Sequence, residues 1–284
     1  MRKVFAIMAV AVMASSVSAQ QVIIDFDGNA LPDETVLIGS AEVRAEGGDP
    51  GGYLKVTDAA NGERSTIIFP DLTGDTPVTS LNIKADLRVG GGTDSPADGF
   101  SFNLARPDDP VVTAGDGNGF AAAPAGEQNL PEEGTQTGIG VGFDEWFSGD
   151  GDVIGLSVRV DNELVSQVEL PTKNGALDDI TSLQTGPNDD GINNLGWAPF
   201  EIDLNSAGQL KVSYKGNLYV DEQLDVEPFA GRLVFAGRTG GANSAHHIDN
   251  LLLCVPEPGS SLMVLTGMGI LYARLRRREH SRRG

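Results

Sequence analysis

Alternation of apolar and polar residues is the feature that most constrains the fold of this chain. Residues 81–89 read LNIKADLRV, and apolar side chains stand at every second position from Leu81 to Leu87. A period of two places one row of side chains on each face of a β-strand. The same period recurs in residues 156–161 and 210–215, which predicts half-buried antiparallel strands in all three segments.

Short strand-like runs fill most of the remaining body. They are QVIIDF, YLKVT, STIIF, GFSFNLA, GIGVGFD, ELVSQVEL, FEIDL, GRLVFAG and HHIDNLLL. Loops rich in glycine, aspartate, asparagine and proline separate them, and the body shows neither a long amphipathic helix nor an internal repeat. This pattern predicts an all-β protein, a two-sheet sandwich or jelly roll. A body of about 235 residues is long enough for one large β domain or two small ones.

The N-terminal end has the composition of a secretory signal peptide. Two basic residues precede an apolar run at residues 4–14, and a stretch of small residues follows. We therefore expect residues 1–19 to be removed by cleavage before Gln20. The alternative, a membrane anchor, is disfavoured because the run is too short to cross a hydrocarbon core of roughly 30 Å.

The C-terminal end, residues 255–284, has three parts. They are the motif Val255-Pro256-Glu257-Pro258, an uncharged apolar stretch at 259–273 and an arginine-rich tail at 274–284. As a helix rising about 1.5 Å per residue, the apolar stretch would reach roughly 22 Å, a marginal membrane span. Arginines after such a helix hold the tail in the cytoplasm, and their long side chains can reach the interface. We therefore predict a membrane helix with the body outside the cytoplasm, in preference to the alternative of a buried core helix.

This three-part order resembles a PEP-CTERM sorting signal, with Pro256, Glu257 and Pro258 as its motif. The resemblance implies processing by an exosortase, a membrane enzyme of bacteria that make extracellular polysaccharide. It implies that the protein is exported to the cell envelope or beyond and is anchored transiently in the inner membrane by its C-terminal helix. It implies nothing about what the body binds.

The body is strongly acidic. The whole chain has 20 lysines and arginines and 40 aspartates and glutamates. Two of the basic residues lie in the leader and six in the tail, and two of the acidic residues lie in the tail, so residues 20–254 keep 12 basic and 38 acidic residues, a net charge of −26. This charge argues against nucleic acid and anionic membrane surfaces as partners. It fits divalent cations or neutral sugars, and it fits solubility alone equally well.

Cys254 is the only cysteine. The protein therefore has no internal disulfide, and packing or a bound metal must hold an exported fold together. We expect Cys254 to be a small apolar residue at a strand end, with a linkage at the processing site as the alternative.

Several segments of the body, taken in order, resemble the legume-lectin-like branch of the concanavalin A-like lectins and glucanases. They are ADGFSFNLA (97–105), GIGVGFDEW (138–146) followed by VIGLSVRV (153–160), WAPFEIDLNSAGQLKVSYKG (197–216) and GRLVFAGRTGGANSAHHIDNLLL (231–253). The resemblance implies a concanavalin A-like antiparallel β-sandwich over residues 20–254.

The resemblance also implies a sugar site braced by calcium. Asp98 matches the family aspartate that accepts hydrogen bonds from sugar hydroxyls, often after a cis Ala-Asp peptide. Asp144 matches an aspartate of the calcium site. Gly117 and Gly119, in the long loop before residue 138, would correspond to the glycine-rich loop whose backbone amides reach the sugar.

The metal loop departs from the family pattern. Gly142 and Val153 stand where the family has the glutamate and histidine of a second, transition-metal site, so we expect that site to be absent. The loop is also shorter, and Asp150 and Asp152 could supply the hard oxygen ligands that calcium takes. A solvated acidic turn is the alternative.

No catalytic motif accompanies this resemblance. A retaining glucanase of this fold uses two carboxylates roughly 5 Å apart, normally from Glu-x-Asp-x-Glu on one strand, and that pattern does not occur. Asp144 and Glu145 are adjacent, so they should face opposite sides of a strand. His246 and His247 lack the spacing of a zinc site and fit packing or capping.

The sequence therefore predicts an exported, envelope-sorted carbohydrate-binding protein associated with extracellular polysaccharide, and not an enzyme. Two alternatives remain. One is a structural matrix protein without a working sugar site, and the other is a glycoside hydrolase of the same fold.

Overall fold

The computed structural model describes residues 19–27, 31–71, 73–122 and 126–256. Residues 1–18 of the predicted signal peptide, most of the predicted sorting motif, the apolar stretch 259–273 and the arginine-rich tail lie outside these ranges. No helix among the described residues has both the length and the apolar character needed to span a bilayer.

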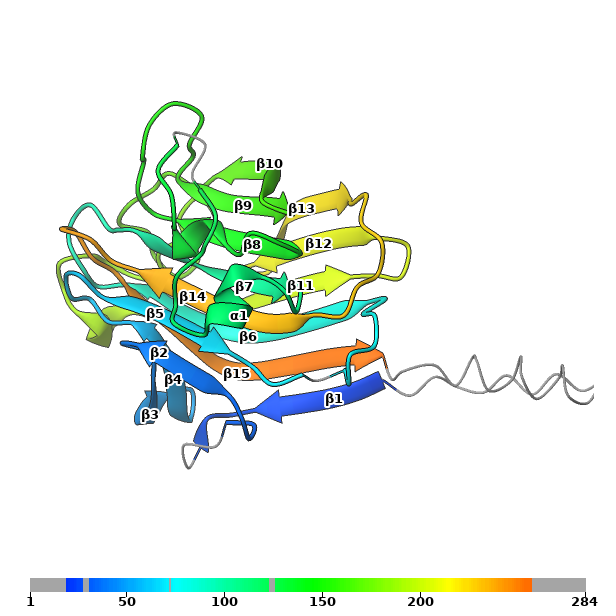
Figure 1. Cartoon of the computed structure of the whole chain (residues 1–284). Coiled ribbons are helices and arrows are strands. Elements are labelled where there is room, and N and C mark those ends of the chain that lie inside the picture. The colour runs from blue at the N-terminus through cyan, green and yellow to red at the C-terminus, as the bar shows by residue number, and fades with distance from the viewer. Residues whose placement is uncertain (1–18, 28–30, 72, 123–125, 257–284) are drawn as a thin grey trace, which may run out of the picture.

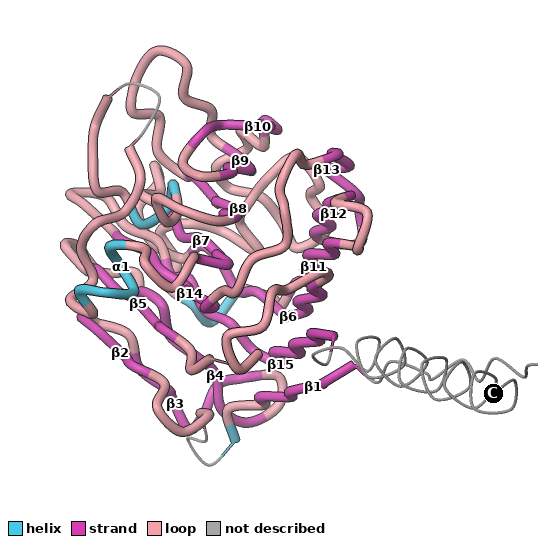
Figure 2. Tube along the Cα trace, turned by 45° about the vertical axis from the view of Figure 1, so that its right-hand side comes forward, coloured by secondary structure: helices cyan, strands magenta, loops and turns pink. Residues whose placement is uncertain are grey.

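Two antiparallel sheets face each other, which confirms the predicted all-β sandwich. Sheet A has eight strands, in the order β13 (Asn217–Gln223), β12 (Gln209–Tyr214), β11 (Ala198–Leu204), β6 (Leu81–Gly90), β15 (Ala245–Pro256), β4 (Gly51–Thr57) and β3 (Glu42–Gly48), with β1 (Ala19–Ile24) paired to the end of β15. Sheet B has seven, in the order β10 (Glu163–Glu169), β9 (Gly155–Val160), β8 (Ile139–Asp144), β7 (Gly99–Ala105), β14 (Arg232–Arg238), β5 (Arg64–Ile68) and β2 (Val36–Gly39). Figure 2 shows the two sheets as two rows of strands.

The core lies between the sheets and follows the alternation of the sequence. In β6, Leu81, Ile83, Ala85 and Leu87 are buried, and Lys84 on the other face is exposed. Aromatic rings join the two sheets, since Phe102 of β7 lies 4.8 Å from Phe200 of β11 between ring centroids. Burial of these apolar side chains on one shared face is the main stabilisation of such a sandwich.

Strands β1 and β15 bring the two ends of the described chain together (Figure 1). Ala19 pairs with Pro256, and Gln21 pairs with Cys254, which is a half-buried free cysteine at the end of a strand. Val255, the first residue of the predicted sorting motif, is buried in the core. The strand thus continues two residues past residue 254.

The long loop between β7 and β8 covers the outer face of sheet B. It contains α1 (Pro110–Ala114) and the 3-10 helix η2 (Pro131–Glu133). Val111 and Phe120 pack on Ile68, Val234 and Ala236 of sheet B and form a second, smaller core. A further 3-10 helix, η3 (Ile192–Asn194), lies in the long connection before β11.

Candidate functional site

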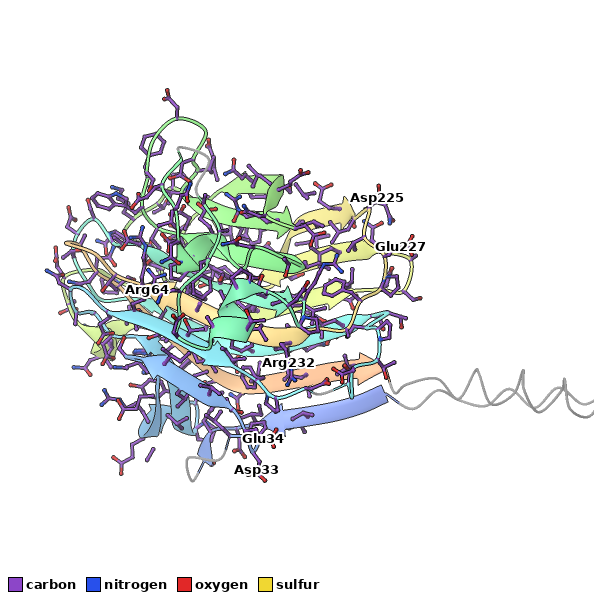
Figure 3. All side chains as sticks on the ribbon, in the orientation of Figure 1. Asp33, Glu34, Arg64, Asp225, Glu227 and Arg232 are labelled. Carbon is purple, nitrogen blue, oxygen red and sulfur yellow. The ribbon has the colours of Figure 1, made fainter. Side chains whose placement is uncertain are left out.

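Sequence-distant strands bring Asp98 and Asp144 together at one end of sheet B. Asp98 directly precedes β7, and Asp144 ends β8, where it pairs with Gly99. The Glu145 N–H donates to the Asp98 carbonyl oxygen at 2.9 Å, and the Asp98 N–H donates to the Arg238 carbonyl oxygen at 3.1 Å. The Ala97–Asp98 peptide is cis, as the lectin resemblance implied. This end of the sandwich carries Arg64, and Asp225 and Glu227 lie at the other end (Figure 3).

The Asp98 carboxylate has one oxygen paired and one free. Oδ1 lies 3.7 Å from Nη2 of Arg238. Oδ2 is buried and has no hydrogen-bond partner among the described residues. Burial raises the pKa of Asp98, and the charge of Arg238 opposes this shift. A Cβ at residue 240 would lie 3.0 Å from Oδ2, so a side chain at this position would crowd the carboxylate and glycine does not.

Arg238 is held beside Asp98 by η2, which we call the strap (Pro131–Glu133). Nε of Arg238 donates to both carboxylate oxygens of Glu132, at 2.8 and 3.0 Å. Its Nη2 also lies 3.9 Å from Oε1 of Glu127. Glu132 is buried, and this burial raises the pKa of Glu132 to about 7, although Arg238 acts in the opposite direction. The bidentate pair fixes the guanidinium at the edge of the Asp98 carboxylate.

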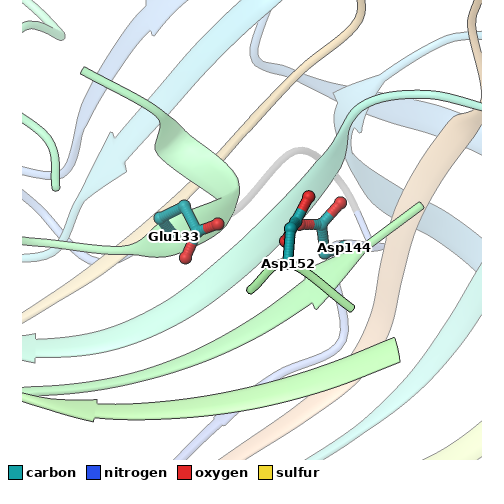
Figure 4. Close-up of side chains that lie close together, drawn as sticks. All are labelled: Glu133, Asp144 and Asp152. Carbon is teal, nitrogen blue, oxygen red and sulfur yellow. The ribbon is translucent and has the colours of Figure 1, made fainter. Parts of the chain in front are cut away.

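Three buried carboxylates form a cluster next to this site: Glu133, Asp144 and Asp152 (Figure 4). One carboxylate oxygen from each lies within 4.8 Å of the others. Asp144 Oδ1 accepts the Trp146 N–H at 2.9 Å, and Asp152 Oδ1 accepts the Val153 N–H at 2.9 Å. Burial, followed by the charge of Asp152, raises the pKa of Asp144 well above its ordinary value.

The chemistry of this cluster fits calcium. All three donors are hard carboxylate oxygens, which Ca²⁺ prefers. Glu133 is bound by Arg159, whose Nε donates to Oε2 at 2.8 Å. Among the ion pairs of the described residues, none involves Asp144 or Asp152. Two buried carboxylates without a cationic partner are costly, and a divalent cation would remove that cost.

Asp150 and Glu133 depart from what the sequence indicated. Asp150 is exposed in the turn and does not belong to the cluster, whereas Asp152 does. Glu133 was missed, because it comes from the strap and no local spacing relates it to Asp144. The only sequence signal was its place in a loop too long to be a simple connection.

Gly117 and Gly119 lie in the same loop but pack elsewhere. A Cβ at Gly117 would lie 3.1 Å from a side-chain carbon of Ile38, and its carbonyl oxygen accepts Nε of Arg64. The Gly119 N–H already donates to Oδ1 of Asn129 at 2.9 Å. Glu127, which belongs to this loop but not to the strap, lies beside Arg238.

His246 and Glu145 form a buried pair behind Asp98. Their side chains are inaccessible to solvent, and Nε2 of His246 lies 2.7 Å from Oε2 of Glu145. The other oxygen of Glu145 accepts Nε2 of Gln184 at 2.5 Å. His247 points to the other face, where Nε of Arg88 donates to its Nδ1 at 3.0 Å. Both histidines are therefore satisfied inside the fold.

Solved lectin structures share this architecture. A lectin from Bauhinia forficata in complex with GalNAc matches with a TM-score of 0.57 and 16% identity, over 85% of this chain and 100% of that chain. The metal-free form of lectin I-B4 from Griffonia simplicifolia matches with a TM-score of 0.54 and 18% identity, over 82% and 98%. The Ca²⁺-bound exoplasmic/lumenal domain of VIP36 matches with a TM-score of 0.51 and 13% identity, over 86% and 93%.

At these identities the likeness establishes the fold, which is that of the legume and L-type lectins. No protein-family model matches the sequence. No curated protein matches it.

Proposed function

We propose that this protein binds carbohydrate at Asp98 and does not hydrolyse it. The observation that carries the proposal is the Asp98 carboxylate, whose side chain is 10% exposed and whose Oδ2 atom has no hydrogen-bond partner among the described residues. A buried acceptor without a hydrogen bond costs free energy until a donor reaches it. A sugar hydroxyl is such a donor, and Arg238 beside Oδ1 offers a guanidinium to a neighbouring hydroxyl oxygen.

Two exposed aromatic residues directly follow the residue whose N–H binds the Asp98 backbone. Trp146 is 43% exposed and Phe147 is 58% exposed. They follow Glu145, whose N–H is bound to the Asp98 carbonyl oxygen. Aromatic side chains provide flat apolar surface of a size that matches one face of a sugar ring. We propose that they contact the apolar face of a sugar ring.

Calcium would be held by Asp144 and Asp152, and it would supply the positive charge that offsets these two carboxylates. The residues around the calcium site would hold Asp98 in place. Asp144 ends the strand paired with β7, and the residue after it holds the Asp98 backbone. Because of this link, holding the turn between β8 and β9 in place also holds Asp98 in place.

The arrangement of carboxyl groups favours binding over hydrolysis. A glycosidase needs two carboxyls free to act on the substrate. Near Asp98, Glu132 is bound by Arg238, Glu133 by Arg159 and Glu145 by His246. Each of these groups is engaged within the protein. The glycoside hydrolase and the structural matrix protein therefore stand as outcomes of the test.

We also propose that the protein is exported, sorted to the envelope through Pro256-Glu257-Pro258 and associated with extracellular polysaccharide. The basis for this part is the sequence of the two ends. Its partners would be a polysaccharide or glycan, an exosortase and, transiently, the inner membrane.

The test is titration of the purified protein against a panel of polysaccharides by calorimetry, with Asp98→Asn as the variant. Removing the charge of the acceptor should weaken binding at least tenfold, equivalent to about 1.4 kcal/mol. Asp150→Asn is the matched control, because it removes a carboxylate from an exposed turn nearby. Equal affinity of Asp98→Asn and wild type would place binding elsewhere. Binding to no glycan would favour the structural protein, and steady release of reducing ends would indicate the hydrolase.

A further inference from the structure

The carboxylate cluster draws one member from outside the β8–β9 turn. Asp144 and Asp152 flank that turn, whereas Glu133 belongs to the strap. The strap lies over sheet B and contacts β7, β8, β14 and β5. It is held there by the Ser101 hydroxyl, which donates to the Pro131 carbonyl oxygen at 2.5 Å.

Gly142 allows the strap to come this close. A Cβ at residue 142 would lie 2.4 Å from the Glu132 carbonyl oxygen and 2.7 Å from Oγ of Ser157. Any side chain there would displace the strap. Without one, the strap backbone passes over β8 and brings Glu133 to Asp144.

The ion pair with Arg159 leaves Glu133 able to bind a cation. Arg159 contacts only Oε2, through Nε at 2.8 Å and Nη2 at 2.5 Å. Arg159 is also tied to the Asn162 carbonyl oxygen. One guanidinium faces three carboxylates, so the group as a whole carries two uncompensated negative charges when ionised. A divalent cation balances that number.

Glu132, the residue before Glu133 in the strap, acts on the proposed sugar acceptor Asp98 through Arg238. Glu132 holds Arg238 through two hydrogen bonds, and Arg238 lies against Asp98. Two consecutive glutamates therefore connect one short helix to two places, the carboxylate cluster and the Asp98 carboxylate.

We infer that Glu133 is a metal ligand supplied by the strap, and that the bound cation positions Arg238 beside Asp98 through Glu132. The inference rests on the proposed function for its second half only. Glu133 is the ligand, and Glu132 and Arg238 are positioning residues. Cation binding fastens the strap to sheet B, and the strap then keeps the Arg238 guanidinium at the edge of the sugar acceptor.

The first experiment measures the metal alone. Tb³⁺ replaces Ca²⁺ at oxygen sites, and Trp146, whose N–H binds Asp144, should sensitise its luminescence. Titration of the whole protein with Tb³⁺, and competition with Ca²⁺, gives the affinity without any sugar. We expect Glu133→Gln to weaken metal binding tenfold or more, as Asp152→Asn should. Asp150→Asn should leave it unchanged.

A purely structural role for Glu133 gives a different result. If Glu133 only pairs with Arg159, Glu133→Gln lowers the melting temperature equally with and without Ca²⁺ and keeps wild-type Tb³⁺ affinity. That outcome would overturn the inference. The double variant Glu133→Gln/Arg159→Gln leaves neither charge buried alone, so it guards against a folding defect. It must still bind metal at least tenfold more weakly.

The second experiment separates the inference from the proposed function. Glu132→Gln should keep Tb³⁺ affinity within twofold and weaken glycan binding at least threefold, since Arg238 loses its anionic partner. Metal binding that depends on Glu133 in a protein that binds no glycan would support the ligand and refute the sugar site. A wild-type protein that binds no Tb³⁺ would refute the ligand, whatever its glycan binding.

Discussion

The outer faces of the two sheets carry polar residues at similar alternating positions, yet they differ in burial. On sheet A, Lys84 and Glu201 form an ion pair at 3.2 Å with side chains 50% and 38% exposed. On sheet B, Ser101, Asn103 and Arg159 are each at most 5% exposed, because the long loop covers them. Lys84 and Glu201 are thus solvent contacts on sheet A, whereas Ser101, Asn103 and Arg159 lie beneath a loop on sheet B.

Asn103 shows what such an anchor does. Its Nδ2 donates to the Val234 carbonyl oxygen at 3.0 Å, and its Oδ1 accepts the Thr135 N–H at 3.1 Å. One side chain thereby holds both the neighbouring strand and the segment that follows the strap. Polar side chains such as Asn103 on sheet B fix the loop, whereas Lys84 and Glu201 on sheet A face water.

The largest loss of stability is expected for Arg159→Met. The change leaves Glu133 buried beside Asp144 and Asp152 with no counter-charge, and loss of one partner of a buried pair costs about 3 kcal/mol or more. We expect that loss in the free energy of unfolding, measured by urea denaturation with a chelator present. Added Ca²⁺ should recover part of it. A loss below about 1 kcal/mol would mean that sheet B is no more sensitive than an exposed face.

The two faces should also respond to pH in opposite directions. Burial raises the pKa of Glu132, in the strap over sheet B, from 4.5 to about 7, so the folded state holds a proton that the unfolded state releases, and stability falls as pH rises through this window. Burial lowers the pKa of His247 on sheet A from 6.5 to about 4, so stability rises between pH 4 and 6.5. Each slope is at most about 1.4 kcal/mol per pH unit.

The two slopes can be separated by mutation. Without metal, Glu132→Gln should make stability rise more steeply from pH 4.5 to 6.5, and His247→Gln should make it fall. Chemical denaturation at half-unit pH steps gives both profiles. Profiles that remain parallel to wild type would contradict the assignment.

The smallest effect is expected on sheet A. Lys84→Met removes an exposed ion pair with Glu201, and such pairs contribute about 0.5 kcal/mol or less. The same denaturation assay provides the comparison with Arg159→Met, since both changes replace a cation by methionine. A loss above about 1.5 kcal/mol would show that the outer face of sheet A is also structural.

The alternation in the sequence predicted the sheets because it is a local signal. The row from Leu81 to Leu87 faces the core as its period requires. Asp98 and Asp144 were named from the lectin resemblance, because no local pattern marks either residue as functional. In the structure they come together at one end of sheet B because Asp144 pairs with Gly99, the residue after Asp98.

Glu133 and Arg238 could not be found in this way. Arg238 reaches Glu132 across 106 positions of sequence, and nothing in either segment encodes that register. Gly117 and Gly119 were expected to bring backbone amides to the sugar, and in the structure the Gly119 N–H donates to Asn129. Glycine indicates backbone freedom, and here that freedom serves packing against Ile38 and Pro110.

The pairing of β1 with β15 decides how the molecule would carry mechanical load. Ala19 lies opposite Pro256, so a pull that separates these two residues opens the β1–β15 ladder one residue pair at a time. A pull between the Asp98 end and Pro256 runs instead along the 12 residues of β15, where the ladder with β6 is loaded in shear. A protein held by its C-terminal end and gripping a polymer at the opposite end would therefore be loaded in its strong direction.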